Sequence, residues 1–500
     1  MKRFAAALLF CLSLCLSLLL TGCGQDNAAC THEHVSDWVY DTQATCQKQG
    51  VRHKECLDCG KIIITESYHS GHEYENGVCK FCGRAQYDEQ YNYKDYTVGD
   101  VEGYIITGLG YCKSAKLSVP ETHNGKPVLA IGDRVFKDQA DITYVFIPKT
   151  VVSVGDEAFR NCAKLETVAF AAGSACTAIG NNAFCDCPAL TKFEVPHGVT
   201  RLSNGLFSGD AALEDLLLHD GITAVGAETF EGCTSLLTIE KNGMAYLGNG
   251  GNHYFLLLKV TDKTAAALAP EPGLKIVGSY AFTGCRNLTA LTLPTGVVSL
   301  SDYAVSGCTA LQDVQLPDSL VTIGAHAFAG CSSLTHIDLP QHLFGIGDCA
   351  FSDCDALSSI TLPDSLRALG SAAFSRTAVT PTEAGGICYL GSADNPYFAL
   401  VDIKDTTVAT LSPHADVKLI AGSALSGCNE LTTVTLPAGL GGIGAAAFAN
   451  CRVLSSVTAT GSVTVAERIE DTPVPLALDS PAAWAEALTG AYLYRYWFLQ

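Results

Sequence analysis

The feature that most constrains this chain is a repeat with a period of 23 residues between positions 277 and 374. Each unit carries a cysteine, a leucine three residues later and a proline six residues after that; the cysteines are Cys285, Cys308, Cys331 and Cys354. An apolar-Gly-x-x-Ala-Phe motif recurs between them, as at residues 323–328. A fixed period of this length is the sequence signature of a solenoid, in which each unit forms one coil.

Within one coil, the sequence predicts a short strand, a turn and then a short helix or 3₁₀ turn. Leu334, Ile337 and Leu339 have the spacing of a strand whose inward side chains are apolar. Pro340 would end that strand, because proline cannot donate to a sheet ladder. Phe351 would begin the helix or 3₁₀ turn of the next coil and fill the space between coils. We therefore expect stacking to bury continuous apolar columns.

The evenly spaced cysteines allow three interpretations. They could bind metal, form disulfides or fill a tight apolar corner as small hydrophobic side chains. One cysteine per coil at a fixed apolar position favours the third interpretation, because free cysteine is among the most buried residue types.

Composition and missing motifs exclude several functional classes. The 500 residues are 48% hydrophobic, which is enough for a large core, and the formal net charge is −20, so we expect no nucleic-acid partner. The sequence has no H-E-x-x-H, no G-x-S-x-G at a strand-to-helix turn and no phosphate-binding glycine loop. Because solenoids usually present surfaces, we expect a protein that is not an enzyme.

Residues 1–22 are predicted to be a lipoprotein signal peptide. Two basic residues precede an apolar run, and the run ends in Leu20-Thr21-Gly22-Cys23, which resembles the bacterial lipobox. Cleavage before Cys23 would leave that residue lipidated, with a polar tether over 23–29. The alternatives are an ordinary signal peptide or a single membrane anchor. The small residues before Cys23 favour lipidation.

Residues 30–84 are rich in cysteine and histidine and lack the repeat. They contain two C-x-x-C-G motifs, separated by 19 residues, with cysteines Cys56, Cys59, Cys79 and Cys82. This spacing is typical of a zinc ribbon, in which four thiolates hold a structural Zn²⁺ with no open position. His72 or Cys46 could replace one ligand. The alternative is two disulfides, since an exported domain can meet oxidising conditions, but the doubled spacing favours zinc.

The remainder is predicted to be one solenoid between two flanking segments. Residues 85–99 would be a linker, 100–459 a solenoid of about twelve coils and 460–500 a C-terminal cap. We expect Tyr104–Thr107 and Leu117–Pro120 to pair as opening strands. Asn124-Gly125 would form a turn after them.

Two longer inserts, 240–272 and 375–417, interrupt the coils and resemble each other. The sequence Tyr-Leu-Gly at 246–248 is repeated at 389–391, an offset of 143 residues. Each insert is expected to be a hairpin, which is either a protruding binding loop or an irregular coil of the same sheet. The apolar strands that follow, Phe255–Val260 and Phe398–Ile403, favour the second interpretation because they need burial.

The coil consensus, I-G-x-x-A-F-x-x-C-x-x-L-x-x-[VIL]-x-L-P, resembles the BspA-like leucine-rich repeat family of bacterial surface proteins over residues 100–459. The resemblance implies a β-rich repeat solenoid of the α/β leucine-rich repeat class. It also implies surface exposure and adhesion or ligand binding, in some members to host matrix proteins or other bacteria. The family has no shared catalytic residues. Together with the lipobox, it predicts an exported protein that is lipid-anchored to the outer face of the bacterial cell membrane.

Two functions remain open. The first is binding of a host or bacterial surface protein or glycan through the solvent side of the strands, at Thr289, Thr292, Gln312, Gln315, His336, Asp338, Ser359 and Thr361. The second is a structural spacer that presents the N-terminal module or a partner at the cell surface. About twelve coils at about 4.8 Å each would span about 60 Å.

Overall fold

The computed structural model describes residues 32, 34–42, 50–58, 60–68, 74–75, 78–79, 91–110, 114–459, 466–467 and 474–475. The chain divides into two units, Met1–Gln90 and Tyr91–Gln500. The described residues form strands and turns and contain no helix, so none of them belongs to a helix that could cross a membrane.

The first unit contains two small antiparallel sheets. The larger one has the order β1-β2-β3, with β1 Val39–Thr42, β2 Gly50–Glu55 and β3 Ile62–Tyr68. The smaller one pairs β4 Tyr74–Glu75 with β5 Val78–Cys79.

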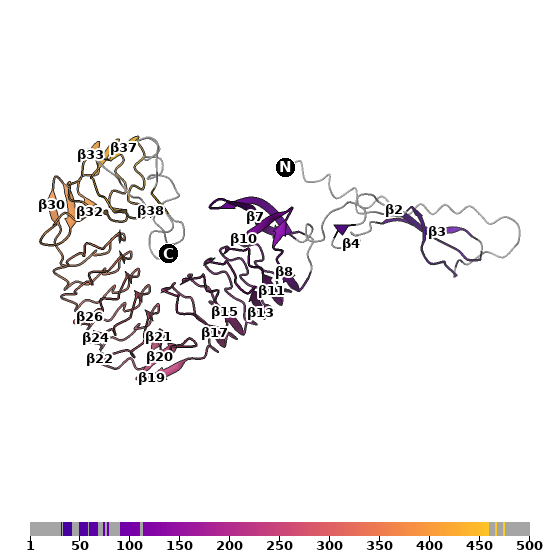
Figure 1. Ribbon diagram of the computed structural model, residues 1–500, viewed down its shortest axis with the longest axis horizontal. Coiled ribbons are helices and arrows are strands. Elements are labelled where there is room, and N and C mark those ends of the chain that lie inside the picture. Colours follow the sequence, from indigo (N-terminus) through magenta and orange to yellow (C-terminus); the bar gives the residue numbers. More distant parts are fainter. Residues whose placement is uncertain are drawn as a thin grey trace, which may run out of the picture. The chain divides into compact units, whose positions relative to one another are not determined.

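The second unit is a β-solenoid with two ladders of short, mostly parallel strands, and Figure 1 shows its coils stacked one on the next. The first ladder contains the I-G motif of each coil. Its strands are β7 Val101–Leu109, β10 Lys126–Ile131, β12 Ser153–Val154, β14 Ala178–Ile179, β16 Arg201–Leu202, β18 Ala224–Val225, β21 Leu256–Val260, β23 Ile276–Val277, β25 Ser299–Leu300, β27 Thr322–Ile323, β28 Gly345–Ile346, β29 Ala368–Leu369, β32 Ala399–Ile403, β34 Leu419–Ile420 and β36 Gly442–Ile443.

The second ladder contains the L-x-x-[VIL]-x-L segment of each coil and is discontinuous. Its three sheets are β8 Lys116–Ser118, β11 Tyr144–Ile147, β13 Thr167–Phe170, β15 Lys192–Glu194 and β17 Asp215–Leu217; then β22 Ala267–Leu268, β24 Ala290–Thr292 and β26 Asp313–Gln315; then β33 Thr410–Leu411, β35 Thr433–Leu436 and β37 Ser456–Ala459. The breaks fall around the two inserts.

The solenoid has about fifteen turns, rather than the predicted twelve. The extra turns come from segments without the consensus: the opening strand β7, and one strand from each insert, β21 and β32. All three pair in parallel with a regular coil of the first ladder, so they extend the stack.

The predicted short helix or 3₁₀ turn in each coil is wrong. The segment after each I-G pair is a series of turns whose backbone N–H groups donate to the next coil, as from His326 to Asp348 and from Phe328 to Ala350, both at 2.8 Å. Each regular coil also has two residues with a left-handed backbone, such as His326 (φ 54°) and Gly330 (φ 74°). A right-handed helix excludes that conformation.

The predicted apolar columns are confirmed. The phenylalanines stack from coil to coil, as Phe328 does on Phe351 at a centroid distance of 5.2 Å. Cys285, Cys308 and Cys331 are fully buried, and every cysteine side chain that the structure describes is a free thiol. The cysteine column therefore fills the core as a small side chain, as predicted.

One predicted strand is absent, although its burial pattern is present. Residues 335–339 are not in a strand. Ile337 and Leu339 are nevertheless buried, while His336 and Asp338 are exposed. The alternation of side chains thus persists where the backbone ladder has opened.

Both inserts are irregular coils of the first-ladder sheet, as expected. In the first, β19 Ile239–Lys241 pairs with β20 Met244–Leu247, which pairs with β21. In the second, β30 Thr382–Ala384 pairs with β31 Ile387–Leu390, which pairs with β32. The backbone N–H of Glu271 donates to the Tyr246 hydroxyl, and that of His414 donates to Tyr389, so the offset of 143 residues extends to matched contacts.

Several predicted boundaries change. Residues 91–98 of the predicted linker form β6 Tyr91–Val98, which pairs with β7. The two expected opening strands lie in different ladders and do not pair with each other. The turn at Asn124-Gly125 is confirmed between β9 Thr122–His123 and β10. Of the predicted cap, the structure describes only β38 Ala466–Glu467 and β39 Val474–Pro475, an antiparallel pair.

Candidate functional site

The eight residues predicted to bind ligand are all exposed; we call them the strand face. Thr292 of β24 lies directly opposite Gln315 of β26, so the side chains form rungs. The inward neighbour Leu291 is almost fully buried and Val314 is buried. The fold therefore presents these polar side chains on one surface over a fixed apolar core.

Most side chains of the strand face have unused hydrogen-bonding capacity. Thr289 donates to the backbone oxygen of Ala266 at 3.0 Å, and His336 Nε2 lies 2.9 Å from Asp338 Oδ1. Within the described part of the chain, the other five side chains have no hydrogen-bond partner: Thr292, Gln312, Gln315, Ser359 and Thr361. They present amide and hydroxyl groups to solvent.

A groove that we did not predict lies beside the first insert. One part, of about 350 Å³, is lined by residues 214–217, 237–239 and 247–250 and by His253. The other part, of about 410 Å³, is lined by His197 and by residues 218–221 and 249–251. Asn249 and Gly250 line both parts, so the loop between β20 and β21 separates them.

The loop is fixed by the Asn249 side chain. Its Nδ2 donates to Asp220 Oδ1 at 2.7 Å, and its Oδ1 accepts the backbone N–H groups of Gly251 and Asn252 at 3.0 and 2.7 Å. The groove is therefore bounded by ordered contacts at the Asp220 turn.

Two leucines make part of the groove apolar. Leu217 is 40% exposed and Leu237 is 64% exposed. Leu217 occupies the outward strand position that holds Glu194, Thr292 and Gln315 in other coils. A large apolar side chain at that position exposes its surface to water at a cost that burial against a partner would remove.

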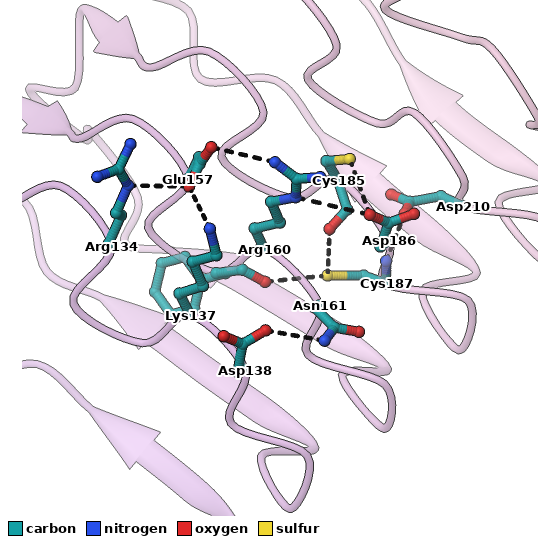
Figure 2. Close-up of polar contacts among 11 residues, drawn as sticks. Arg134, Lys137, Asp138, Glu157, Arg160, Asn161, Cys185, Asp186, Cys187 and Asp210 are labelled. Carbon is teal, nitrogen blue, oxygen red and sulfur yellow. Dashed lines mark hydrogen bonds and ion pairs between the residues drawn. The ribbon is translucent and has the colours of Figure 1, made fainter.

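A cluster of charges joins the first regular coils, and Figure 2 shows Glu157 between three cations. Its carboxylate accepts from Lys137 Nζ at 2.5 Å, Arg134 Nε at 2.9 Å and Arg160 Nη1 at 3.1 Å. The hydrogen bond from Lys137, together with that from Arg134, lowers the pKa of Glu157 to about 2. Since the cations satisfy a carboxylate of the protein itself, the cluster acts as a brace between coils.

Asp210 stands where the column would otherwise place a cysteine, and it is fully buried. Its Oδ1 accepts the backbone N–H of Cys187 at 2.7 Å, whereas Oδ2 has no partner among the described residues. Burial raises the pKa of Asp210 to about 9, so the carboxyl is protonated at neutral pH. Figure 2 shows it beside Asp186 and Cys187.

Part of the predicted zinc site is described. Cys56 is buried, the Gly60 N–H donates to its backbone oxygen at 2.8 Å, and Gly60 has φ 71°. This is the tight turn expected of the first C-x-x-C-G motif. Cys79 lies in β5, but its side chain is outside the described residues, as are Cys23, Cys46, Cys59, His72 and Cys82. Among the described residues, no three His, Cys, Asp or Glu side chains are placed to hold a metal.

The sequence contained a signal for the groove that our interpretation did not use. Leu216, Leu217 and Leu218 are consecutive, although regular coils alternate apolar and polar residues there. The glycines at 248, 250 and 251 mark the loop that forms the groove wall.

Comparison with known families and structures identifies relatives. The family described as BspA type leucine rich repeat region matches residues 129–250, 270–383 and 403–468. The two gaps fall on the hairpins β20–β21 and β31–β32. A search of curated proteins gives no match.

Three similar solved structures come from bacteria. A leucine-rich repeat protein from Bacteroides ovatus is 23% identical, with 74% of this chain and 70% of that chain covered and a TM-score of 0.24. A leucine rich cell surface protein from Faecalibacterium prausnitzii is 20% identical, with coverages of 79% and 96% and a TM-score of 0.25. The pneumococcal vaccine antigen PcpA is 14% identical, with coverages of 75% and 87% and a TM-score of 0.29.

Proposed function

Because the chain belongs to the BspA-type leucine-rich repeat family, we propose that it is a non-catalytic bacterial cell-surface protein that binds a protein or glycan through the strand face. The observation that carries this proposal is the set of five strand-face side chains without partners. Unused amide and hydroxyl groups on a rigid surface pay little conformational entropy when they bind, because the backbone is already ordered.

Binding of the full chain to an array of matrix proteins and glycans tests the proposal. A saturable ligand should bind at least about tenfold more weakly to a triple variant, Thr292→Ala, Gln315→Ala and Asp338→Ala. The matched control is Thr283→Ala, Gln341→Ala and Asp364→Ala, which removes the same exposed side-chain types outside the strand face. A folded protein that binds nothing on the array would support the structural spacer instead.

The anchor and the metal are separate parts of the proposal. The lipobox supports lipidation of Cys23, so Cys23→Ala should move the protein from the membrane fraction to the medium. The paired C-x-x-C-G motifs, and the turn at Cys56, support a structural Zn²⁺ held by Cys56, Cys59, Cys79 and Cys82. Metal analysis should then give one zinc per chain, and Cys56→Ser should lose it. Quantitative disulfide formation by these cysteines would contradict the zinc site.

A further inference from the structure

The second ladder ends at β17 with an open edge. In a regular coil, the ladder continues: Leu291 of β24 pairs onward with Val314 of β26. Leu216 is the corresponding residue of β17, which pairs with β15 and with no later strand. The next coil makes one backbone contact, from the Leu237 N–H to the Glu214 oxygen at 3.1 Å, and then diverges to pair with β20.

The second insert shows how such an edge can be closed. Its Gly391 oxygen accepts the backbone N–H of Leu362 at 3.4 Å, which links the insert to the preceding coil. Gly248 and Leu218 hold the same places beside the first insert, each directly after the shared Tyr-Leu or Leu-x-Leu sequence. No backbone hydrogen bond joins these two residues in the described solenoid. The groove of about 350 Å³ occupies the space between them.

The chemistry of the groove is apolar with an acidic rim. Leu217 and Leu237 supply the exposed apolar surface. Glu214 lines one part of the groove and Asp220 the other, and neither forms an ion pair with a cation of the described residues. An edge strand with free N–H and C=O groups is a template for pairing with another chain.

We propose that the groove binds an extended peptide segment of a partner protein, which adds to β17 as a strand. Backbone hydrogen bonds to Leu216 would hold the segment, as in other cases of strand addition. Apolar side chains of the segment would cover Leu217 and Leu237, and lysine or arginine side chains would face Glu214 and Asp220. This site is distinct from the strand face, so the two proposals can fail separately.

The test uses the full chain in detergent micelles and a fluorescent peptide, acetyl-Lys-Val-Lys-Val-Lys-Val-amide, with binding followed by anisotropy. We expect saturable binding that weakens at least about tenfold in the double variant Leu217→Arg, Leu237→Arg. The matched control is Val321→Arg, Phe344→Arg, which changes two other exposed apolar side chains and should leave binding unchanged. Hydrogen exchange should slow at Leu216–Leu218 when the peptide binds.

A second measurement leaves the protein unaltered. A peptide with N-methylated valines cannot donate those backbone hydrogen bonds and should bind at least about tenfold more weakly, as should a peptide with glutamate in place of lysine. The proposal is overturned if the first peptide does not bind saturably, or if N-methylation or the double variant leaves its affinity unchanged. Loss of peptide binding in the double variant with an unchanged array ligand would separate the groove from the strand face.

Discussion

The Cys354 thiol donates to the backbone oxygen of Phe328, one coil earlier, at an Sγ–O distance of 3.1 Å. The same contact joins Cys162 to Phe136 and Cys308 to Phe282. The cysteine therefore does more than fill a corner: it satisfies a buried backbone acceptor that an aliphatic side chain would leave without a partner. This explains why the column holds cysteine rather than alanine or valine.

Replacing Cys354 with alanine should lower the free energy of unfolding by about 1–3 kcal/mol, because a buried oxygen loses its donor and a small cavity opens. Serine should cost less, since its hydroxyl can donate to the same oxygen. Cys349→Ala is the matched control: that thiol is half-buried, and Ala372 holds the same column position in the next coil. Chemical denaturation measures all three variants, and equal stability of Cys354→Ala and the control would contradict the role of the thiol.

Asp210 should make stability depend on pH. Its folded pKa of about 9 lies above the usual value of 3.8, so its contribution is present at low pH and declines as pH rises from about 4 to about 9. Between pH 4 and 7 the decline is on the order of 4 kcal/mol. Asp210→Asn keeps an acceptor for the Cys187 N–H and should remove this slope and raise the melting temperature at pH 8. Identical pH profiles for the variant and the unaltered chain would show that the carboxyl is not buried.

Glu157 should have the opposite dependence. Its folded pKa of about 2 lies below the usual 4.5, so its contribution is present above about pH 4.5 and is lost as pH falls towards 2. Glu157→Gln should therefore destabilise the chain at pH 7 by about 1 kcal/mol, with the magnitude limited by solvent screening, and have little effect at pH 2. Thermal melts at the two pH values measure the difference. A larger effect at pH 2 would contradict the ion pairs.

Two glycines should respond differently to alanine. A Cβ added at Gly347 would lie 2.3 Å from the Ala325 backbone nitrogen of the neighbouring coil, so Gly347→Ala should cost about 1–3 kcal/mol or more through steric overlap. Gly307 has a left-handed backbone (φ 72°) with no atom near the added Cβ. Gly307→Ala should cost only about 1 kcal/mol, which is the backbone term. Urea denaturation compares the two, and a greater loss at Gly307 would contradict the close contact between coils.

Much of the fold could be predicted because each coil repeats the same physical problem. The 23-residue period indicated stacking, and the spacing of Phe351, Cys354 and Leu357 indicated which side chains are buried. The helix prediction failed because hydrogen bonds between coils, as from Phe328 to Ala350, compete with those within a segment, and a single coil sequence cannot show that competition.

The strand face and the groove differ in what their sequences reveal. The exposure of Thr292 and Gln315 follows from alternation along one strand, which is a local pattern. The groove depends on where the coil after β17 goes, and Leu237 leaves the ladder only because β19 pairs with β20 instead. That choice lies between distant segments, so only the three-dimensional structure resolves it.

The two inserts share contacts as well as sequence, and this has a consequence for how such a chain can change length. Tyr246 and Tyr389 accept equivalent backbone donors, so either hydroxyl could serve the other's coil. A recombination between the two DNA segments that encode these hairpins would remove or add 143 residues and still join matching coils. The gene can therefore vary the reach of its product in whole modules, and populations of related bacteria should carry alleles that differ by this increment.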